Sequence, residues 1–591
     1  MQWVDTDEYR RAAVVVCSKP GNKTGQMIDK IVEIENDFTL GKHSIAQIEG
    51  SYGKFIHCKE INITCKYPQA VNGDDVKMVY FMHSGHPMEG TCKKYDTFEY
   101  GLTQVWNSLV PAKSSKELLD PMSEYELCNS IAIVGMACKY PGANNIDEFW
   151  SLLENGMDGI IRVPEWRWTK DTAIVTMDDV RKTEAGFLSF PLDMFDAKFF
   201  NTNQADLKYL DPQQRIALKV VWESLEHAGI DPSSLKNTIT GVFGGWWRSD
   251  FKELLQSQGI SNEDFLRIYL VVALRQSREL IWLAIICETK VAILQVGVNL
   301  LLNPFSLDGG IMEGFLAPDG RCKTFDAAAN GFGRAEGAGV LILKRFPDAI
   351  SNGDRIWGLI RGSAIVQEGT SRSMGTPTTA VEAKSMQLAL DRAGVDPRDV
   401  KFIETHGTGT PVGDPVEVAA IAQVYGGRNE DNPLIIGSVK TNIGHTESVC
   451  GIASIQKIVL AMKYSKIPKH LHFNQLNPNI DIASIPALIP VDQLPWRKNC
   501  YGRPRIAGIN SFGITGAQAH VIIQEPPETQ NYNVYASRDA RQLSMLTFSA
   551  KTETSLIAQL NEYTNFLKDC TQNLEDIEFT FYVVVLILLI A

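Results

Sequence analysis

The chain has 591 residues, which is enough for several domains and at least one large core. Apolar residues make up 44% and charged residues 21%, the composition of an ordinary soluble globular protein. The formal net charge of −12 argues against a nucleic-acid-binding surface. We therefore expect neither a nucleic-acid-binding protein nor a fibrous one.

The 11 cysteines are scattered without a repeating spacing, and the N-terminus lacks the residue order of a secretory signal. Free thiols in a reducing cytosol are therefore expected. Six histidines and cysteines near the N-terminus could be grouped as metal ligands, but their spacings fit no standard zinc pattern, so we expect no metal. These residues are His57, Cys58, Cys65, His83, His86 and Cys92.

Two apolar stretches raise the question of a membrane anchor. Residues 264–290 are apolar but interrupted by Arg267, Arg275 and Arg278, and each would be costly at a bilayer centre. Residues 579–591 are uninterrupted but shorter than the roughly 20 residues that a spanning helix needs. Neither is expected to enter a membrane, and the second is expected to be either a buried strand cut off by the chain end or a truncated or misread terminus.

Residues 1–128 differ from the rest of the chain. Strands are predicted in "SYGKFIHCKEINITCKY" and "VKMVYFMH", with polar loops between them. No chemical constellation is present, so this possibly β-rich region has no predicted function. The polar segment 111–130 then connects it to a predicted strand over 131–137 and a predicted helix in 145–156.

A similar helix-loop-strand sequence pattern occurs twice in the rest of the chain. A helix within 211–229 has Asp211 as a cap, Pro212 in its first turn and Gly229 after its end. "SLEHAGIDPSSLKNTITGVFGG" and "ALDRAGVDPRDVKFIETHGTGT" both run from a helix end through Ala-Gly-[Ile/Val]-Asp-Pro to a β-branched stretch and a Gly-rich turn. Either an α/β unit is duplicated or similar helix-loop-strand units occur by chance. Apolar strands such as "GVLILKR" favour an α/β class with buried sheets.

Three Gly-rich turns carry candidate chemistry. "FIETHGTGTPVGDPVEV" places His406 after an apolar strand, with hydroxyls at Thr408 and Thr410 for a polar ligand. "GSVKTNIGHTESVCG" contains Lys440 and His445 in a turn that should open a helix. "GINSFGITGAQAHVII" could direct backbone N–H groups at an oxyanion. Taken alone, His406 is equally well explained as structural, Lys440 and His445 are more often a surface charge and a structural histidine, and the third turn could be a simple strand-to-strand loop. Two histidines in similar settings nevertheless favour a shared site.

Residues 129–525, about two-thirds of the chain, resemble the β-ketoacyl synthase (ketosynthase) domain of polyketide synthases and animal-type fatty acid synthases. Motifs in the family's order include "IAIVGMACKYPGANNIDEFWSLLENGMDGI", "LDPQQRIALKVVWESLEHAGIDPSSL", "GVNLLLNP", "LAPDGRCKTFDAAANGFGRAEGAGVLILKR", "ETHGTGTPVGDPVEV", "SVKTNIGHTESVCGIASIQK" and "INSFGITGAQAHVII". The resemblance implies a thiolase-like duplicated α/β/α/β/α layered fold, with halves of about 129–350 and 351–525. Residues 526–591 are similar to the linker between ketosynthase and acyltransferase, apparently truncated.

The reaction implied by the resemblance is decarboxylative Claisen condensation. An acyl group moves from the phosphopantetheine of an acyl carrier protein to a cysteine, and a decarboxylated malonyl unit attacks that thioester. The family motifs assign His406 and His445 to the malonyl carbonyl and its enolate. Lys440 would support the second histidine electrostatically, and Glu417 would help to fix the site.

The resemblance also implies the substrate contacts and the partners. Thr408 and Thr410 would bind the pantetheine amides, and the backbone N–H of Ile514 would form part of an oxyanion hole. No covalently bound cofactor is expected, because the acyl and malonyl groups are carried on the partner's phosphopantetheine. The expected partners are an acyl carrier protein, an acyltransferase and other megasynthase domains, and a second copy in a homodimer.

The family's nucleophile has no counterpart in this sequence. That cysteine lies in a "TACSSS"-like turn upstream of "GVNLLLNP", and no cysteine occurs here between Cys138 and Cys287. The expected strand before the nucleophile and the start of the helix behind it are missing, with 264–290 in their place. Three interpretations stay open: an impaired ketosynthase, from a gene-model error or real degeneration; a malonyl decarboxylase; or a non-catalytic dimerisation or carrier-binding module.

Overall fold

The computed structural model describes residues 11–18, 76–84, 127–167, 184–259, 292–303, 315–369, 378–498, 503–527 and 557–564, apart from a few positions within these ranges. The chain divides into two compact units, Met1–Leu118 and Leu119–Ala591. In the first unit, β1 (Arg11–Ser18) pairs antiparallel with β2 (Val76–Ser84). The strand predicted in 76–83 is therefore confirmed, whereas the one predicted in 51–67 lies outside the described residues.

The second unit is built on a ten-stranded mixed sheet with the order β13-β11-β10-β15-β16-β9-β3-β8-β7-β6. Its strands are β3 (Ile131–Lys139), β6 (Thr240–Trp246), β7 (Ala292–Asn299), β8 (Gly337–Arg345), β9 (Gly358–Gln367), β10 (Phe402–Glu404), β11 (Leu434–Gly437), β13 (Ala487–Leu488), β15 (Ile506–Phe512) and β16 (Ala517–Gln524). Two short antiparallel pairs accompany it: β4 (Ile160–Arg162) with β5 (Glu184–Gly186), and β12 (Lys466–Ile467) with β14 (Leu494–Pro495).

The α-helices that the structure describes with full bounds in this unit are α3 (Ile146–Glu154), α5 (Pro212–His227), α6 (Phe251–Ser257), α9 (Phe346–Asn352), α10 (Thr379–Ala393), α11 (Gly413–Tyr425), α12 (Lys440–Ile443) and α13 (Cys450–Tyr464). The predicted N-terminal and C-terminal caps of helix α5 are confirmed. Asp211 accepts the N–H of Gln213, Pro212 is the first helical residue, and Gly229 follows the end with φ +65°.

The predicted duplication is confirmed by the sheet. From the junction of β9 and β3, each half continues with two antiparallel pairings and then a parallel one. The two similar sequence segments form α5, a 3₁₀ turn and β6 in one half, and α10, a 3₁₀ turn and β10 in the other. Strands β6 and β10 occupy equivalent places, fourth from the junction in their halves. Chance resemblance of the two segments is thereby excluded.

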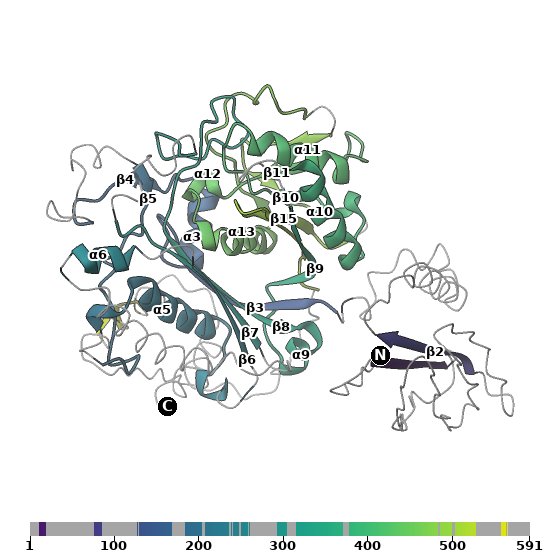
Figure 1. Ribbon diagram of the computed structural model, residues 1–591, viewed down its shortest axis with the longest axis horizontal. Coiled ribbons are helices and arrows are strands. Elements are labelled where there is room, and N and C mark those ends of the chain that lie inside the picture. The colour runs from purple at the N-terminus through teal and green to yellow at the C-terminus, as the bar shows by residue number, and fades with distance from the viewer. Residues whose placement is uncertain are drawn as a thin grey trace, which may run out of the picture. The chain divides into compact units, whose positions relative to one another are not determined.

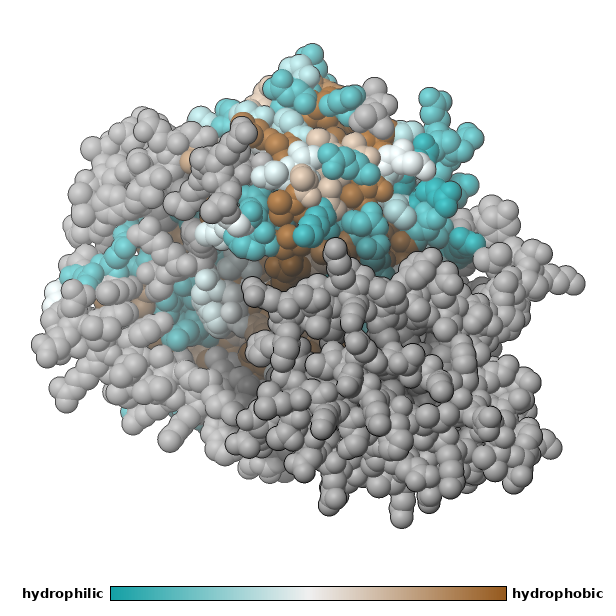
Figure 2. Space-filling model, turned by 45° about the vertical axis from the view of Figure 1, so that its right-hand side comes forward, coloured by the Kyte–Doolittle hydropathy of each residue, from teal (hydrophilic) through white to brown (hydrophobic). Residues whose placement is uncertain are grey.

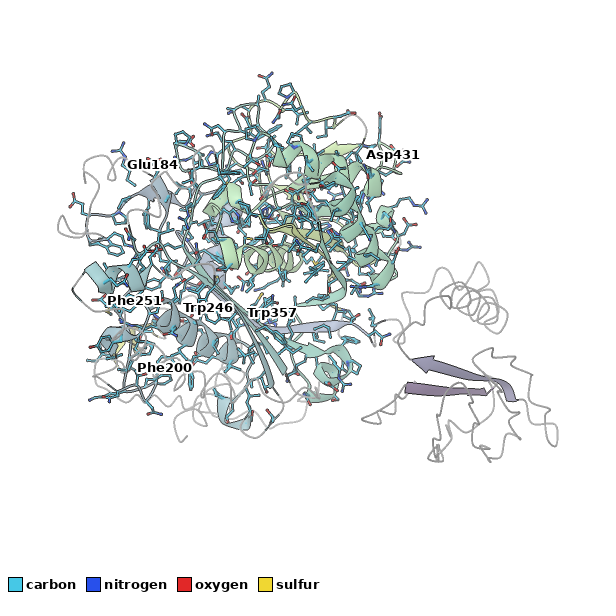
Figure 3. The ribbon with its side chains drawn as sticks, in the orientation of Figure 1. Glu184, Phe200, Trp246, Phe251, Trp357 and Asp431 are labelled. Atoms are coloured by element: carbon cyan, nitrogen blue, oxygen red, sulfur yellow. The ribbon has the colours of Figure 1, made fainter. Side chains whose placement is uncertain are left out.

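The helices and strands of this unit form layers (Figure 1), and three clusters of buried apolar side chains lie between them. Helix α5 packs on one face of the strands around β3 and β8, with α3 and α13 on the other face. Helices α10 and α11 cover the outer side of β9, β10 and β16. Side chains fill the space between these layers (Figure 3), and almost every residue of α13 is buried. The turns at both ends of α13 and β10 are therefore held by a rigid interior.

The surface of the described residues combines hydrophilic and apolar groups (Figure 2). Ile365, Met194 and Phe243 are among the exposed apolar side chains, and scattered residues of this kind are common on soluble proteins. Within the part of the chain that the structure describes, no helix is long and apolar enough to cross a membrane. The two apolar stretches singled out above, 264–290 and 579–591, lie outside the described residues.

Candidate functional site

His406 lies in the loop that follows β10, at the end of a fully buried strand. The carboxylate of Glu417, on α11, accepts the backbone N–H of His406 at 2.7 Å with one oxygen and that of Gly407 at 2.8 Å with the other. Because both carboxylate oxygens accept backbone N–H groups of the loop, Glu417 fixes the backbone position of His406. The sequence prediction that Glu417 supports this site is consistent with its contacts.

His445 follows α12 and lies beside His406. Their ring centroids are 5.4 Å apart and their planes nearly perpendicular, at 85°. The backbone of His445 is held between Gly333, whose carbonyl accepts its N–H at 2.7 Å, and Ala335, whose N–H it accepts at 3.0 Å. The structure thus brings together two histidines that lie 39 positions apart in the sequence.

Each of the two imidazoles uses Nδ1 as an acceptor. Nδ1 of His406 accepts the backbone N–H of Phe512 at 3.3 Å, and Nδ1 of His445 accepts that of Glu447 at 3.0 Å. A neutral imidazole that accepts at Nδ1 carries its proton on Nε2. Both rings therefore present an Nε2–H donor, and both are half-buried, which leaves them open to a ligand.

The histidines are held in the neutral form. Burial lowers the pKa of both rings well below the usual value, and the ammonium of Lys440 lowers it further in each. Lys440 is 1% exposed, and its Nζ has no hydrogen-bond partner among the described residues. The site thus combines two neutral donors with a buried cation, an arrangement that stabilises negative charge developing on an oxygen between them.

Thr408 and Thr410 lie in the same loop as His406. Their hydroxyl oxygens are 3.2 Å apart, and that of Thr410 also accepts the N–H of Gly413 at 3.2 Å. Both residues are half-buried, so each hydroxyl can reach a ligand beside the loop. Gly409, between the two threonines, has φ +78°, and a Cβ there would lie 2.7 Å from the N of Lys323. Packing against the neighbouring segment is what requires glycine at that position.

A buried carboxyl group closes the other side of this loop. Asp414 accepts the N–H of Gly409 at 3.1 Å and that of Phe325 at 2.8 Å. Burial raises its pKa to about 7 despite these hydrogen bonds. Sequence reasoning did not single out Asp414, because an acid in the first turn of a helix is usually a solvated cap.

Ile514 lies in the turn between β15 and β16, two residues after the Phe512 that bonds His406. Its side chain is 45% exposed. The turn is a tight hairpin in which the N–H of Gly513 donates to the carbonyl of Ala517 at 2.8 Å. A simple strand-to-strand loop and a backbone donor site are both compatible with this geometry.

The cysteines whose side chains the structure describes are Cys138, Cys322 and Cys450, all buried and unpaired. Burial raises the pKa of Cys322 to about 12 and raises that of Cys138 well above its usual value, so both stay protonated thiols. Residues 260–291 occupy the place of the family's nucleophile in the sequence and include Cys287. They lie outside the described part of the chain. Within that part no cluster of histidine, cysteine and acidic residues could hold a metal ion.

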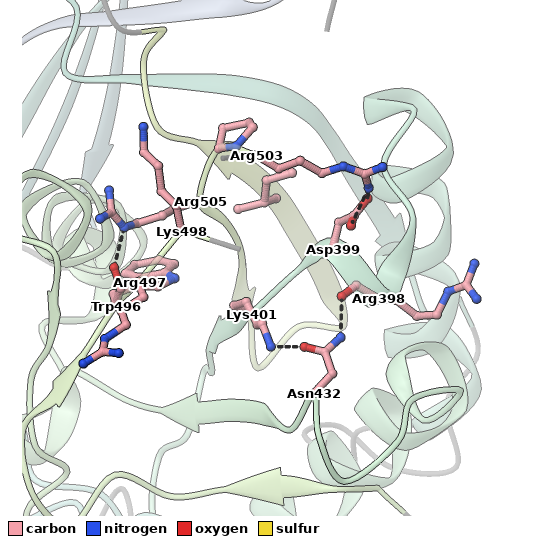
Figure 4. Close-up of a pocket in the computed structure, with 11 residues that line it drawn as sticks. Arg398, Asp399, Lys401, Asn432, Trp496, Arg497, Lys498, Arg503 and Arg505 are labelled. Carbon is pink, nitrogen blue, oxygen red and sulfur yellow. Dashed lines mark hydrogen bonds and ion pairs between the residues drawn. The ribbon is translucent and has the colours of Figure 1, made fainter. Parts of the chain in front are cut away.

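A separate basic pocket of about 290 Å³ lies where β10 and β15 begin (Figure 4). Its cations are largely paired: Arg503 with Asp399 at 3.2 Å, and Lys498 with Glu525 at 3.2 Å. Since His406 follows the opposite end of β10, this pocket is not part of the histidine site.

Three family models match consecutive parts of the chain. The β-ketoacyl synthase N-terminal domain matches residues 128–275 and 279–349, the β-ketoacyl synthase C-terminal domain matches 357–474, and the ketoacyl-synthetase C-terminal extension matches 477–580. His406, His445 and the elements between them, α11, β11 and α12, lie within the match to the C-terminal domain.

Similar proteins agree with these matches. A phenolphthiocerol/phthiocerol polyketide synthase protein of Mycobacterium tuberculosis is 37% identical over 443 residues, which are 69% of this chain and 20% of that protein. A second protein of the same synthase, from Mycobacterium bovis, is 38% identical over 451 residues, 71% of this chain and 24% of that protein. The chain thus spans about a fifth of the length of these relatives.

Among solved structures, the ketosynthase from module 6 of the bacillaene synthase of Bacillus subtilis 168 has a TM-score of 0.63 and 30% identity, covering 76% of this chain and 79% of that one. An oxazolomycin ketosynthase domain of Streptomyces albus JA3453 has a TM-score of 0.61 and 30% identity, covering 74% and 82%.

Proposed function

The chain belongs to the β-ketoacyl synthase family, and from that premise we propose that residues 129–525 act as a ketosynthase-like domain on malonyl thioesters in polyketide synthesis. Its fold is the thiolase-like α/β fold of that family. The substrate is a malonyl group on the phosphopantetheine of an acyl carrier protein, so the protein itself holds no covalent cofactor. The proposal locates this chemistry in the cytosol.

The pairing of His406 with His445 is the observation that carries the proposal. Both neutral rings present an Nε2–H, and a thioester oxygen between them would accept two hydrogen bonds. When the bond between the malonyl methylene and its carboxylate breaks, the electron pair passes into an enolate and CO₂ leaves. The negative charge then rests on that oxygen, where two fixed donors and the Lys440 ammonium stabilise it.

The surrounding groups support the binding of the carrier's arm. We infer that the half-buried hydroxyls of Thr408 and Thr410 bind the pantetheine amides, and that the backbone N–H of Ile514 contributes to an oxyanion hole for the acyl thioester. An acyl carrier protein, an acyltransferase and further megasynthase domains are the partners that this reaction needs. A second copy of the chain would complete the homodimer.

We further propose that acyl transfer to the enzyme is impaired and that malonyl decarboxylation is retained. The sequence has no cysteine between Cys138 and Cys287. Residues 405–505 separate β10 from β15, but only residues 247–291 separate β6 from β7. The connection between β6 and β7 is thus the shorter one, which agrees with the lack of the family's nucleophile turn in the sequence.

Incubating the full chain with malonyl-carrier protein labelled in the free carboxylate tests the proposal. Labelled CO₂ should be released, and His406→Ala should abolish the release because it removes one of the two donors. His227→Gln, on the outer helix α5, is the control that should keep the activity. A folded chain that releases no CO₂ would contradict the decarboxylation and favour the non-catalytic module.

A second measurement addresses the nucleophile. Labelled acyl-carrier protein should leave no covalent label on the chain, and acylation that survives denaturation would overturn this part of the proposal. Sequencing of the transcript across codons 260–300 determines whether a Cys-Ser-Ser turn is encoded. A message that encodes one would assign full condensation activity to the protein and trace the missing turn to the gene model.

A further inference from the structure

Behind the His406 loop runs a line of hydrogen-bonded side chains that the reaction described above does not use. The hydroxyl of Tyr425 lies 2.8 Å from Nε2 of His520, and Nδ1 of His520 lies 2.5 Å from Oδ1 of Asn510. Nδ2 of Asn510 then donates to Glu417 at 2.7 Å. All four side chains are buried, with exposures of 1%, 0%, 1% and 3% from Tyr425 to Glu417.

The direction of these hydrogen bonds follows from the chemistry of the groups. Glu417 accepts backbone N–H groups on both oxygens, so it is an acceptor toward Asn510, which must present its amide nitrogen. The amide oxygen of Asn510 then faces His520, whose Nδ1 must carry the proton. Nε2 of His520 is left as an acceptor and receives the hydroxyl proton of Tyr425. Every member therefore donates toward Glu417.

The secondary structure explains why these groups meet. Asn510 on β15 and His520 on β16 are directly paired residues of the antiparallel hairpin. Glu417 and Tyr425 are eight residues apart on α11, so they lie on the same side of that helix about two turns apart. The pair on the hairpin thus bridges two points of one helix and fixes its rotation relative to the sheet.

Several buried carboxyl groups surround Glu417, so hydrogen-bond donors are needed to stabilise its negative charge. Glu417 shares a buried environment with the carboxyl groups of Asp414 and Glu382, and its charge adds to burial in raising the pKa of both. Burial and the charge of Glu417 raise the pKa of Glu382 to about 9, so Glu382 is protonated at neutral pH. Burial also raises the pKa of Glu417, but the N–H groups of Gly407, Asn510 and His406 oppose that rise. The donors thus favour the charge on Glu417.

We propose that Asn510, His520 and Tyr425 form a one-way hydrogen-bond relay that holds Glu417 ionised and in place, and thereby sets the position of His406. They are positioning residues, because they act on the reaction through Glu417 and the backbone of His406. His406 is fixed twice by the same pair of elements: Glu417 on α11 holds its backbone, and the N–H of Phe512 on β15 holds its ring.

A test that is independent of catalysis uses the protonation of the histidine rings. In the full chain with ¹⁵N-labelled imidazoles, His520 should be protonated at Nδ1 alone, with its signal assigned by its loss in His520→Asn. Asn510→Leu should shift the ring signals of His520 and His406 together. Protonation of His520 at Nε2, or a His406 signal unmoved in folded Asn510→Leu, would overturn the relay.

The kinetic test rests on the proposed malonyl decarboxylation. Asn510→Leu should lower kcat about tenfold, equivalent to about 1.4 kcal/mol, with KM almost unchanged, because a positioning group does not touch the substrate. His520→Asn, which keeps an N–H donor near the Nδ1 position, should retain more activity than His520→Leu. Tyr425→Phe should have a smaller effect, and the control Tyr464→Phe none.

The outcomes separate the relay from the proposed function. If the wild-type chain has no decarboxylase activity, the proposed function is wrong, and the ring signals still decide whether the relay exists. If decarboxylation is present and folded Asn510→Leu keeps the wild-type kcat, the relay does not position the site. Equal activities of His520→Asn and His520→Leu would likewise contradict a donor role for His520.

Discussion

Lys457 on α13 forms a fully buried ion pair with Glu404 at the end of β10, with 2.7 Å between Nζ and the carboxylate oxygen. The other oxygen of Glu404 accepts the N–H of Val439 at 2.5 Å. Because β10 leads to His406 and Val439 directly precedes Lys440, one carboxylate ties together the two segments that carry the site. The central helix therefore determines the spacing of the two histidine loops.

Replacing Lys457 with methionine should destabilise the protein by about 3–5 kcal/mol, because it leaves the Glu404 carboxylate buried without its counter-ion. The half-buried, solvent-accessible pair of Lys466 and Glu154 provides the control, and Lys466→Met should cost at most about 1 kcal/mol. Urea unfolding followed by circular dichroism measures both. Equal losses in the two variants would show that the buried pair has no special weight.

His470 gives the protein a predictable sensitivity to acid. Its Nδ1 accepts the N–H of Ser438 at 3.4 Å, and its Nε2 lies 3.1 Å from the carbonyl of Thr324. Burial lowers its pKa to about 3, against about 6.5 in the unfolded chain. The unfolded state therefore binds the proton first, so the stability due to neutral His470 is complete above about pH 6.5 and is lost as the pH falls toward 3.

Between these limits His470 should contribute about 1.4 kcal/mol per pH unit to the slope of the unfolding free energy. His470→Gln removes the titration, so its slope between pH 6 and 4 should be shallower by about that amount, even if the variant is less stable throughout. Denaturant unfolding at a series of pH values gives both slopes. Parallel curves for the two proteins would contradict the assignment.

The histidine pair and the duplicated fold could be predicted from sequence because each rests on local patterns. Asp211, Pro212 and Gly229 mark a helix by themselves. His406 lies just after the apolar strand β10, and His445 lies in the Gly-containing turn after β11 and α12. Asn510, His520 and Tyr425 carry no such local signal, since their roles depend on a hairpin register and on the rotation of α11. The register alone could have paired Asn510 with His520, because the turn between them is Gly-rich and the strands alternate.

Gly409 should not tolerate a side chain. Its φ of +78° is strained for any other residue, and a Cβ would lie 2.7 Å from the backbone N of Lys323. Gly409→Ala is therefore expected to cost about 1–3 kcal/mol and to displace the Thr408–Thr410 loop. Gly353→Ala separates backbone strain from the steric clash of the added Cβ, because Gly353 has φ +70° but nothing within 4 Å of its Cβ position. Thermal unfolding should show a larger loss for Gly409→Ala, and equal losses would remove packing as the cause.

Thr410 provides a test of the binding of the carrier's arm. If its hydroxyl bonds a pantetheine amide equally in the ground and transition states, Thr410→Val should raise KM for malonyl-carrier protein about tenfold and leave kcat nearly unchanged. Thr410→Ser keeps the hydroxyl that accepts the N–H of Gly413 and should keep the wild-type KM. Steady-state decarboxylation is measured with malonyl-carrier protein and with a malonyl thioester that lacks the pantetheine amides. The comparison distinguishes a lost hydrogen bond to the pantetheine from a disturbed loop. The truncated substrate should show the same KM with all three proteins, because it cannot use the hydroxyl, and a penalty that persists with it would assign Thr410 to folding of the loop.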